Sequence, residues 1–208
     1  MPRSNESPAE RLAHALPLAG TPGQAYVERR GIPLAIADAA GMRFDADWNG
    51  RPAVLIGMYD RDAQLASVHG RYLETLRGQD KMFTIGPGGG IAMTGTGWQA
   101  EPLILVEGIF DALSLKVCGW DSTATVGRWA PWLPDTCAGR LVWLGFDAND
   151  PGEDEVASYT RHLPRSTVRR LFPPPHCKDW NTALLKRGPA GVARWLRECI
   201  ASHDTTAG

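Results

Sequence analysis

The 208-residue sequence lacks the features that define several common classes of protein. Its four cysteines are widely spaced, with no Cys-x-x-Cys pair and no histidine pair at zinc-finger spacing, so no zinc site is expected. No apolar run has membrane-spanning length and no signal-peptide core is present, which favours a cytoplasmic protein with no membrane partner. Lysine and arginine number 22 and aspartate and glutamate 23, so a nucleic-acid partner would need a local basic patch or metal ions.

Two patterns of apolar residues divide the chain. In the first part, short helical segments are followed by strands of alternating polarity, such as AVLIGMYD and LASVHGRYL, and Asn49-Gly50 is the clearest hairpin turn. This pattern indicates a small α+β subdomain with an antiparallel meander. From Pro102 onward, strands and helices alternate, which is typical of a mostly parallel sheet flanked by helices. The predicted fold class is therefore α/β.

The expected elements follow from these patterns. Helices are expected over 7–19, 24–30, 33–40, 108–118, 128–133, 153–163 and 179–201, and strands over 42–47, 53–60, 65–73, 103–106, 122–126, 141–146 and 167–172. The stretch 81–95, with its glycines and proline, is expected to be a loop or hinge. The predicted organisation is a helical lead-in (1–22), the α+β subdomain (23–98), the parallel-sheet domain with C-terminal helices (99–201) and a disordered tail (202–208).

Acidic and amide side chains follow two of the apolar strands in the second part. Glu107 ends the strand LILV, and Asp111 stands four residues further on, one helical turn away on the same face. Asp147, Asn149 and Asp150 follow LVWLGF in the same way. Parallel strands end at one edge of a sheet, so these oxygen atoms can converge with almost no basic residue between them. The sequence therefore predicts a site for a hard cation, Mg²⁺ or Mn²⁺.

A structural explanation exists for each acidic segment taken alone. Negative charge near a helix N-terminus stabilises the helix by about 0.3–1 kcal/mol, so Glu107 and Asp111 would simply cap a helix. The segment DANDPG would then be an ordinary turn. Capping does not explain why both acidic clusters terminate apolar strands, and this coincidence favours the functional interpretation.

These two segments, VEGIFDALSL and LGFDANDPG, resemble the Toprim domain, whose motifs are E-G-x-x-D and D-x-D-x-x-G. Toprim domains occur in bacterial-type primases, type IA and type II topoisomerases and certain nucleases. YVERRGIPLAIADAAGMRF and RPAVLIGMYDRDAQLASVHGRYL resemble the segment before Toprim in bacterial primases, and KMF resembles the lysine-aromatic stretch that follows. KDWN matches a motif downstream of Toprim in many phage and mobile-element primases. The resemblance covers residues 23–187 and favours a primase catalytic core.

The resemblance implies metal-dependent nucleotidyl transfer, in which a glutamate acts as general acid or base and aspartates hold the metal. The catalytic residues implied in this chain are Glu107, Asp111 and Asp147, and the implied metal ligands are Glu107, Asp111, Asp147, Asn149 and Asp150.

Basic and polar residues outside these motifs match family positions implicated in binding template or nucleotide. They are Arg71 of HGRY, Lys81 of KMF and Lys178, Asp179 and Asn181 of KDWN. Each also has a structural alternative. The two residues of the first part would lie on a solvated edge of the meander. Asp179 would be a good N-cap for the final helices.

The sequence departs from the family in its charge and in its length. Asn149 stands where the second aspartate of D-x-D is expected, so metal affinity should fall unless Asp150 compensates. No zinc module precedes the core, and little chain follows Ala201, so we expect a zinc-binding template reader or a replicative helicase to be separate partners.

The predicted function is primer synthesis on single-stranded DNA from nucleoside triphosphates, in a phage or mobile-element replication system. A Toprim nuclease and a non-catalytic nucleic-acid-binding module are the alternatives.

Overall fold

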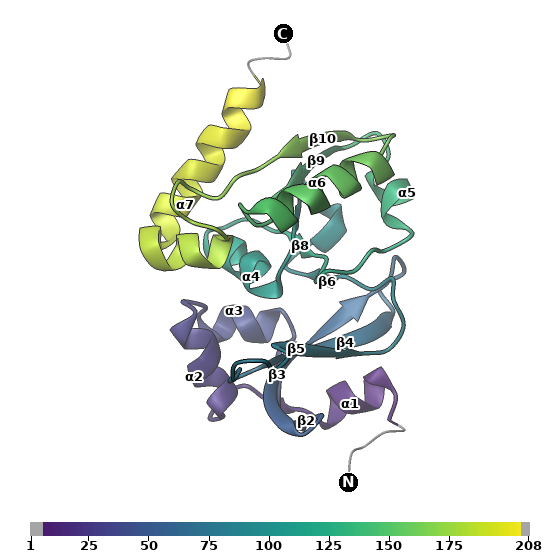
Figure 1. Ribbon diagram of the computed structural model, residues 1–208, viewed down its shortest axis with the longest axis vertical. Helices are drawn as coiled ribbons and strands as arrows, with labels where there is room; N and C mark the ends of the chain where they lie inside the picture. The colour runs from purple at the N-terminus through teal and green to yellow at the C-terminus, as the bar shows by residue number, and fades with distance from the viewer. Residues whose placement is uncertain (1–5, 205–208) are drawn as a thin grey trace. The chain divides into compact units, whose positions relative to one another are not determined.

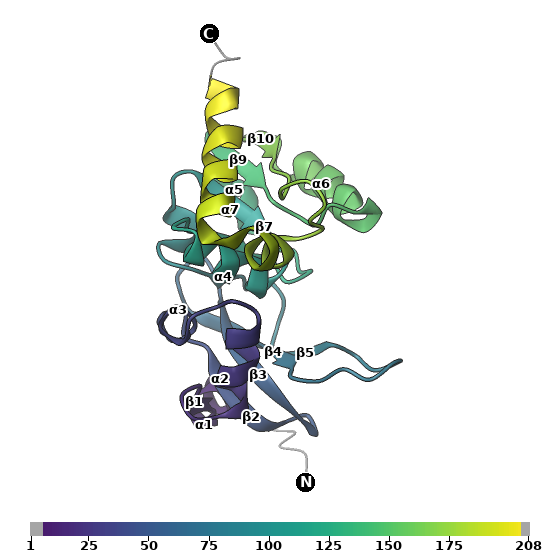
Figure 2. The same ribbon diagram turned by 90° about the vertical axis from the view of Figure 1, so that its left-hand side faces the viewer.

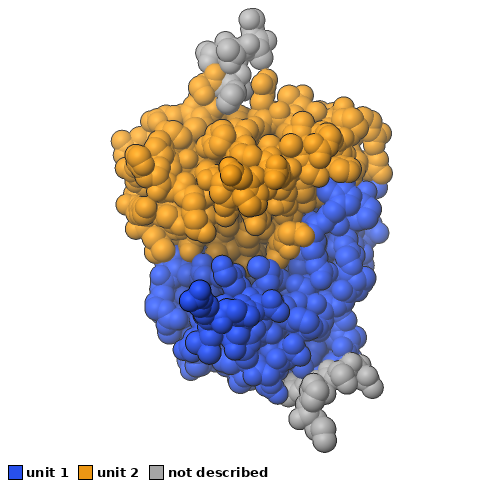
Figure 3. Space-filling model, viewed as in Figure 1, with its two compact units in different colours: residues 1–92, 128–132 blue, residues 93–127, 133–208 orange. Residues whose placement is uncertain are grey.

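The computed structural model describes residues 6–204, which form two compact units (Figure 3). Unit 1 contains the residues up to 92 together with 128–132, and unit 2 contains 93–127 and the residues from 133 onward. Two five-stranded sheets organise the chain: one consists of β1 to β5 and the other of β6 to β10 (Figure 1). No helix within residues 6–204 is long and apolar enough to cross a membrane.

Unit 1 is built on an antiparallel sheet in the order β1-β2-β3-β4-β5. Its strands are β1 (Leu16–Pro17), β2 (Arg43–Trp48), β3 (Arg51–Tyr59), β4 (Leu65–Tyr72) and β5 (Met82–Ile85), and α1 (Pro8–His14), α2 (Pro22–Arg29) and α3 (Leu34–Ala39) precede β2. Asn49 and Gly50 link β2 to β3 with φ angles of 50° and 87°, the positive values that a type I′ hairpin turn requires. Figure 2 shows the β4–β5 hairpin extending away from the rest of its sheet.

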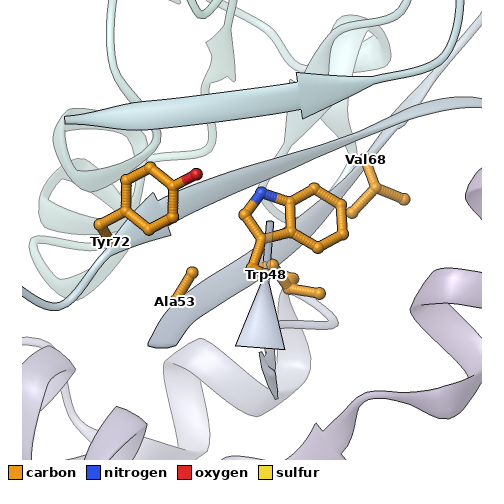
Figure 4. Close-up of a cluster of buried hydrophobic side chains, with 5 residues drawn as sticks. Trp48, Ala53, Val68 and Tyr72 are labelled. Carbon is orange, nitrogen blue, oxygen red and sulfur yellow. The ribbon is translucent and has the colours of Figure 1, made fainter. Parts of the chain in front are cut away.

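The core of unit 1 is centred on Trp48, which is 1% exposed (Figure 4). The buried cluster around it consists of Ala53, Leu55, Val68 and Tyr72. A Cβ at Gly70 would collide with the indole nitrogen, so β4 carries a glycine where the Trp48 ring crosses it. That nitrogen donates to the backbone oxygen of Phe83 at 3.0 Å, which attaches the edge strand β5 to the core.

Unit 2 contains the mostly parallel sheet, in the order β10-β9-β7-β8-β6. The strands are β6 (Ala92–Met93), which begins at the last residue before the unit boundary, β7 (Leu103–Val106), β8 (Thr123–Ala124), β9 (Leu141–Leu144) and β10 (Thr167–Arg170). The helices are η1 (a 3-10 turn, Gly97–Gln99), α4 (Ile109–Val117), α5 (Leu133–Cys137), α6 (Asp150–His162) and α7 (Trp180–Asp204). Every residue of β7 is buried, as expected for a central parallel strand covered on both faces.

The parallel register places the carboxyl ends of β7, β8 and β9 side by side. β7 pairs with both β8 and β9, and Leu105 lies opposite Leu144. β9 pairs in turn with β10. Helix α4 packs against α7, which bends at Gly188 (φ 67°) just before Pro189. The start of α7 is therefore close to the helix that follows β7.

The structure confirms the predicted fold class, with differences in four segments. Helix α1 ends at His14, and the following residues form the short edge strand β1. The segment 128–132 is not helical, because Pro131 disfavours helical geometry in the residue before it. Residues 82–85 form β5 through pairing with β4. The segment expected to be disordered begins inside α7, which runs to Asp204, and 205–208 lie outside the described residues.

Candidate active site

Glu107 and Asp147 come together at the carboxyl ends of neighbouring parallel strands. The backbone N–H of Gly145 donates to the oxygen of Leu105 at 2.7 Å, so the chain leaving β9 runs directly beside the end of β7. The backbone N–H of Asp147 then donates to the Glu107 carboxylate. Both side chains are half-buried. The two motifs therefore meet through two carboxylates that remain accessible to solvent.

Asn149 is the N-cap of α6, and both ends of its amide are engaged. Its Oδ1 accepts from the N–H of Gly152 at 2.8 Å, and the amide also hydrogen-bonds to the Asp147 carboxylate. A Cβ at Gly152 would collide with the backbone oxygen of Asp147, which explains the glycine at this motif position. Asn149 thus starts the helix and orients Asp147, but it adds no charge.

Asp111 lies in the first turn of α4, is 9% exposed and accepts hydrogen bonds from the start of α7. Its Oδ1 accepts the backbone N–H groups of Trp180 at 2.9 Å and Asn181 at 3.1 Å. An ideal Cβ at Gly108 would lie 2.7 Å from Asp111 Oδ2, so this glycine leaves room for the carboxyl group. Burial, followed by the charge of Asp179, raises the pKa of Asp111 to about 7.

The sequence argument that placed Asp111 on the same helical face as Glu107 does not hold. Gly108 is the N-cap of α4, so Glu107 precedes the helix and the four-residue spacing is not a helical turn. Asp111 reaches α7 instead, and its hydrogen bonds are structural. The charges of Asp179 and Asp147 nevertheless act on the Asp111 carboxyl, so it lies near the acidic pair, and its expected roles as a catalytic residue and metal ligand stay predictions.

The KDWN segment contacts both the chain that leaves β9 and the helix α4 that follows β7. The Trp180 indole donates to the oxygen of Gly145 at 2.8 Å, and an ideal Cβ at Gly145 would lie only 2.9 Å from that nitrogen. The Asn181 amide donates to Ser114 Oγ at 3.0 Å. Trp180 and Asn181 are both buried. These contacts give Asn181 a structural role, and its expected role in binding nucleotide or nucleic acid stays a prediction.

Asp179 and Lys178 lie beside the acidic pair. Asp179 Oδ1 accepts from the N–H of Thr182 at 2.6 Å, which is the N-capping role considered from the sequence. Lys178 Nζ lies 3.0 Å from Asp179 Oδ2 and its side chain is 67% exposed. The backbone oxygen of Lys178 accepts from the N–H of Ala148 at 2.7 Å, so the lysine is fixed next to the second motif. Its ammonium group is available to a ligand at the site.

Helix α6 contributes an acidic residue that the sequence analysis did not identify. Glu155 is partly buried, whereas Asp150, the residue expected to compensate for Asn149, is exposed. Burial, followed by the charges of Glu107 and Asp147, raises the pKa of Glu155 to about 7. Glu155 is three residues after Gly152 and four before Tyr159, so the three lie on one helical face, and this spacing is the signal that could have identified it.

The donor chemistry of this region suits a hard cation. Burial and then the neighbouring charge of Asp147 raise the pKa of Glu107, and burial and then Asp179 raise that of Asp147. A cation would relieve this repulsion, and all the donors are oxygens. As placed, no group of three or more His, Cys, Asp or Glu side chains among residues 6–204 is arranged to hold a metal ion. Glu107 and Asp147 therefore suit a hard cation in their charge and in their oxygen donors.

We expect Glu155→Gln to stabilise the metal-free chain at high pH only. The folded pKa of Glu155 is raised from 4.5 to about 7, so the carboxyl is protonated in both states at low pH and costs stability once ionised. The difference in Tm between variant and wild type should be near zero below pH 4.5 and largest near pH 8. Each kcal/mol by which the variant raises the free energy of unfolding should raise Tm by about 2–4 °C.

Differential scanning calorimetry with a chelator, over this pH range, measures that difference. Asp154→Asn removes a charge from the exposed side of the same helix and should show no such trend. A constant difference at every pH would contradict the assigned position of Glu155.

Arg71 and Lys81 belong to unit 1. Arg71 lies on β4 opposite Met82, is half-buried, and its Nε is buried with no hydrogen-bond partner among the described residues. Lys81 is exposed just before β5. Burial, followed by the charges of Arg71 and Arg128, lowers the pKa of His69 to about 4. Arg128 thus joins Arg71 as a basic residue near His69, and no sequence pattern indicated it.

Comparison with solved structures shows that the chain has the fold of primase catalytic cores. The chain superposes on the zinc-binding and RNA polymerase domains of the Aquifex aeolicus primase with a TM-score of 0.67 and 16% identity. That match covers 94% of this chain and 62% of the other, so the chain spans less than two thirds of that structure.

Two further structures have the same fold. A DnaG primase catalytic domain bound to single-stranded DNA matches with a TM-score of 0.67 and 16% identity, over 92% of this chain and 77% of that one. The primase fragment of the bacteriophage T7 primase-helicase protein matches with a TM-score of 0.57 and 21% identity, over 82% and 71%. No known family model matches the sequence, and no curated protein does. At these identities, the likeness to primase cores is shown for the fold, as the two motifs predicted.

Proposed function

We propose that this chain is a primase catalytic core, a metal-dependent nucleotidyltransferase that makes primers on single-stranded DNA from nucleoside triphosphates. The observation that carries the proposal is the half-buried pair Glu107 and Asp147 at the ends of β7 and β9. The shared fold supplies the framework, and this pair supplies the chemistry at the strand ends where α/β proteins bind ligands.

Glu107 and Asp147 would hold Mg²⁺ or Mn²⁺. When bound, the cation would orient the triphosphate and offset the charge that develops at phosphorus. The chain's own contribution is to orient Asp147 through Asn149 and to place the Lys178 ammonium beside the acidic residues. Glu107 would also act as the general acid or base, and its raised pKa in the metal-free chain comes from burial and then from the charge of Asp147.

Unit 1 would contribute contacts to DNA. Arg71, Lys81 and Arg128 provide positive charge on the antiparallel unit, and one structural neighbour holds single-stranded DNA. The KDWN segment and the phage T7 neighbour support a role in a phage or mobile-element replication system. A zinc-binding template reader and a helicase, which are named with the cores in two of the neighbours, would act together with this core.

Primer synthesis is the direct test of this function. The chain should incorporate labelled nucleoside triphosphates into short products on single-stranded DNA when Mg²⁺ or Mn²⁺ is present, and not with a chelator. Release of nucleotides from DNA without added triphosphates would instead identify a nuclease. DNA binding without either reaction, under all metal conditions, would identify a binding module and would reject the enzymatic proposal.

We expect charge reversal at Arg71 and Lys81 together to weaken binding to single-stranded DNA. Each lost phosphate contact should reduce the slope of log K against log salt by about 0.7 for a single strand. Fluorescence anisotropy at several salt concentrations measures both effects. Arg61→Glu, in the exposed turn after β3, is the matched control and should leave affinity almost unchanged. Wild-type binding by the double reversal would remove these residues from the DNA interface.

A further inference from the structure

The second motif lacks a negative charge at Asn149. Its amide accepts from the N–H of Gly152 and hydrogen-bonds to the Asp147 carboxylate, so both ends have partners. Asp150 is exposed in the first turn of α6, and it is not among the charges that raise the pKa of Glu107 or Asp147. A cation held by Glu107 and Asp147 would therefore have one carboxylate fewer around it than the D-x-D pattern provides.

The geometry of α6 places Glu155 over the same strand end. Gly152 lies against the backbone oxygen of Asp147, and Tyr159 is buried with its ring 5.0 Å from that of Phe146. Both contacts are to the residues that follow β9. Glu155 is three residues from Gly152 and four from Tyr159, so it shares the helical face that these two residues define.

The neighbouring acidic residues of α6 point elsewhere. Glu153 pairs with Arg170 at 2.6 Å, and Asp154 is exposed. The like charges that act on Glu155 are those of Glu107 and Asp147, while Tyr159 lies on its own helix and hydrogen-bonds to Thr125. The partly buried carboxylate of α6 therefore faces the acidic pair.

We propose that Glu155 supplies the negative charge that Asn149 lacks, and that it strengthens cation binding at Glu107 and Asp147 from the first turns of α6. This inference rests on the proposed metal site. Among residues 6–204, no three or more His, Cys, Asp or Glu side chains are close enough together to hold an ion directly. Glu155 therefore acts on the cation through its electric field or through a bridging water. It is a positioning residue for the cation.

A cycle of variants at positions 149 and 155 tests the inference without an activity assay. Mn²⁺ binding to the full chain, measured by electron paramagnetic resonance without nucleotide or DNA, should weaken about tenfold or more in Glu155→Gln, as for other outer-shell partners. Asn149→Asp should tighten binding, because aspartate is an equally good N-cap and adds a charge. The double variant should return toward the wild-type affinity.

Two controls separate this inference from the proposed function. Asp154→Asn removes a charge from the exposed side of α6 and should change Mn²⁺ affinity less than twofold. Asp147→Asn should abolish binding. If Glu155→Gln binds like the wild type while Asp147→Asn does not bind, the metal site stands and the role of Glu155 is rejected.

The remaining outcomes are equally decisive. If Asp154→Asn weakens binding as much as Glu155→Gln, the effect is a general charge effect and the inference fails. A double variant as weak as Glu155→Gln would show that the two positions do not substitute for each other, and it would also reject the inference. If Asp147→Asn binds like the wild type, the metal site itself is wrong, and the proposed function fails together with the inference.

Discussion

Glu107→Gln should reduce primer synthesis by about 10²–10⁴-fold, the range usual for loss of a general acid or base. Glutamine has nearly the same shape and keeps an oxygen that can accept the N–H of Asp147, so the strand end should be preserved. The variant loses the ionisable group and one of the two carboxylates proposed to hold the cation. The assay is incorporation of labelled nucleotide on single-stranded DNA at saturating metal.

Two measurements make this result interpretable. The Tm of Glu107→Gln should equal or slightly exceed that of the wild type, because burial and repulsion raise the pKa of the glutamate that it replaces. Glu198→Gln, an exposed glutamate of α7, should retain wild-type activity. If Glu107→Gln turned over substrate as fast as the wild type, Glu107 would have only a structural role at the start of α4, and its catalytic assignment would be wrong.

Asp111→Ala should lower the free energy of unfolding by about 2–6 kcal/mol. The substitution leaves two buried N–H groups, of Trp180 and Asn181, without their acceptor, and each unsatisfied donor costs about 1–3 kcal/mol. Urea denaturation followed by circular dichroism measures the loss.

Asp111→Asn is the matched variant for this residue. Its amide oxygen can accept the same two N–H groups, and it buries no charge where the pKa of the aspartate is raised to about 7. It should therefore be as stable as the wild type at pH 8, or more so. Loss of Mn²⁺ binding in a stable Asp111→Asn would show that the carboxylate also serves the metal, whereas retained binding would confine it to the framework.

The sequence allowed the architecture to be predicted because strand and helix patterns are local. The apolar run LILV and the turn at Asn49-Gly50 were recognised without tertiary information. Strands that depend on a partner were missed. Leu16–Pro17 is too short to show a period, and Met82–Ile85 lies half-exposed at a sheet edge, where pairing with β4 decides the structure.

The site could be predicted only as far as the strand ends. The pairing of Glu107 with Asp147 follows from parallel strands, whose carboxyl ends share one edge. The direction of Asp111 did not follow, because it depends on where α4 begins and on α7 lying close by. Glu155 was missed because α6 has acidic residues on several sides, and only the contact of Gly152 with Asp147 shows which side faces the site.

The KDWN contacts have a consequence for the order in which the site is completed during synthesis. Once the ribosome has added Asp147, both acidic strand ends are present in the nascent chain. The donors to Asp111 and to the oxygen of Gly145 come later, however, because they belong to Trp180 and Asn181. In a nascent chain that has not reached α7, Asp111 therefore lacks the donors of α7, and the core position that Trp180 occupies in unit 2 is unfilled. Because domains generally fold as units, unit 2 should become protease-resistant only after the KDWN segment has been made.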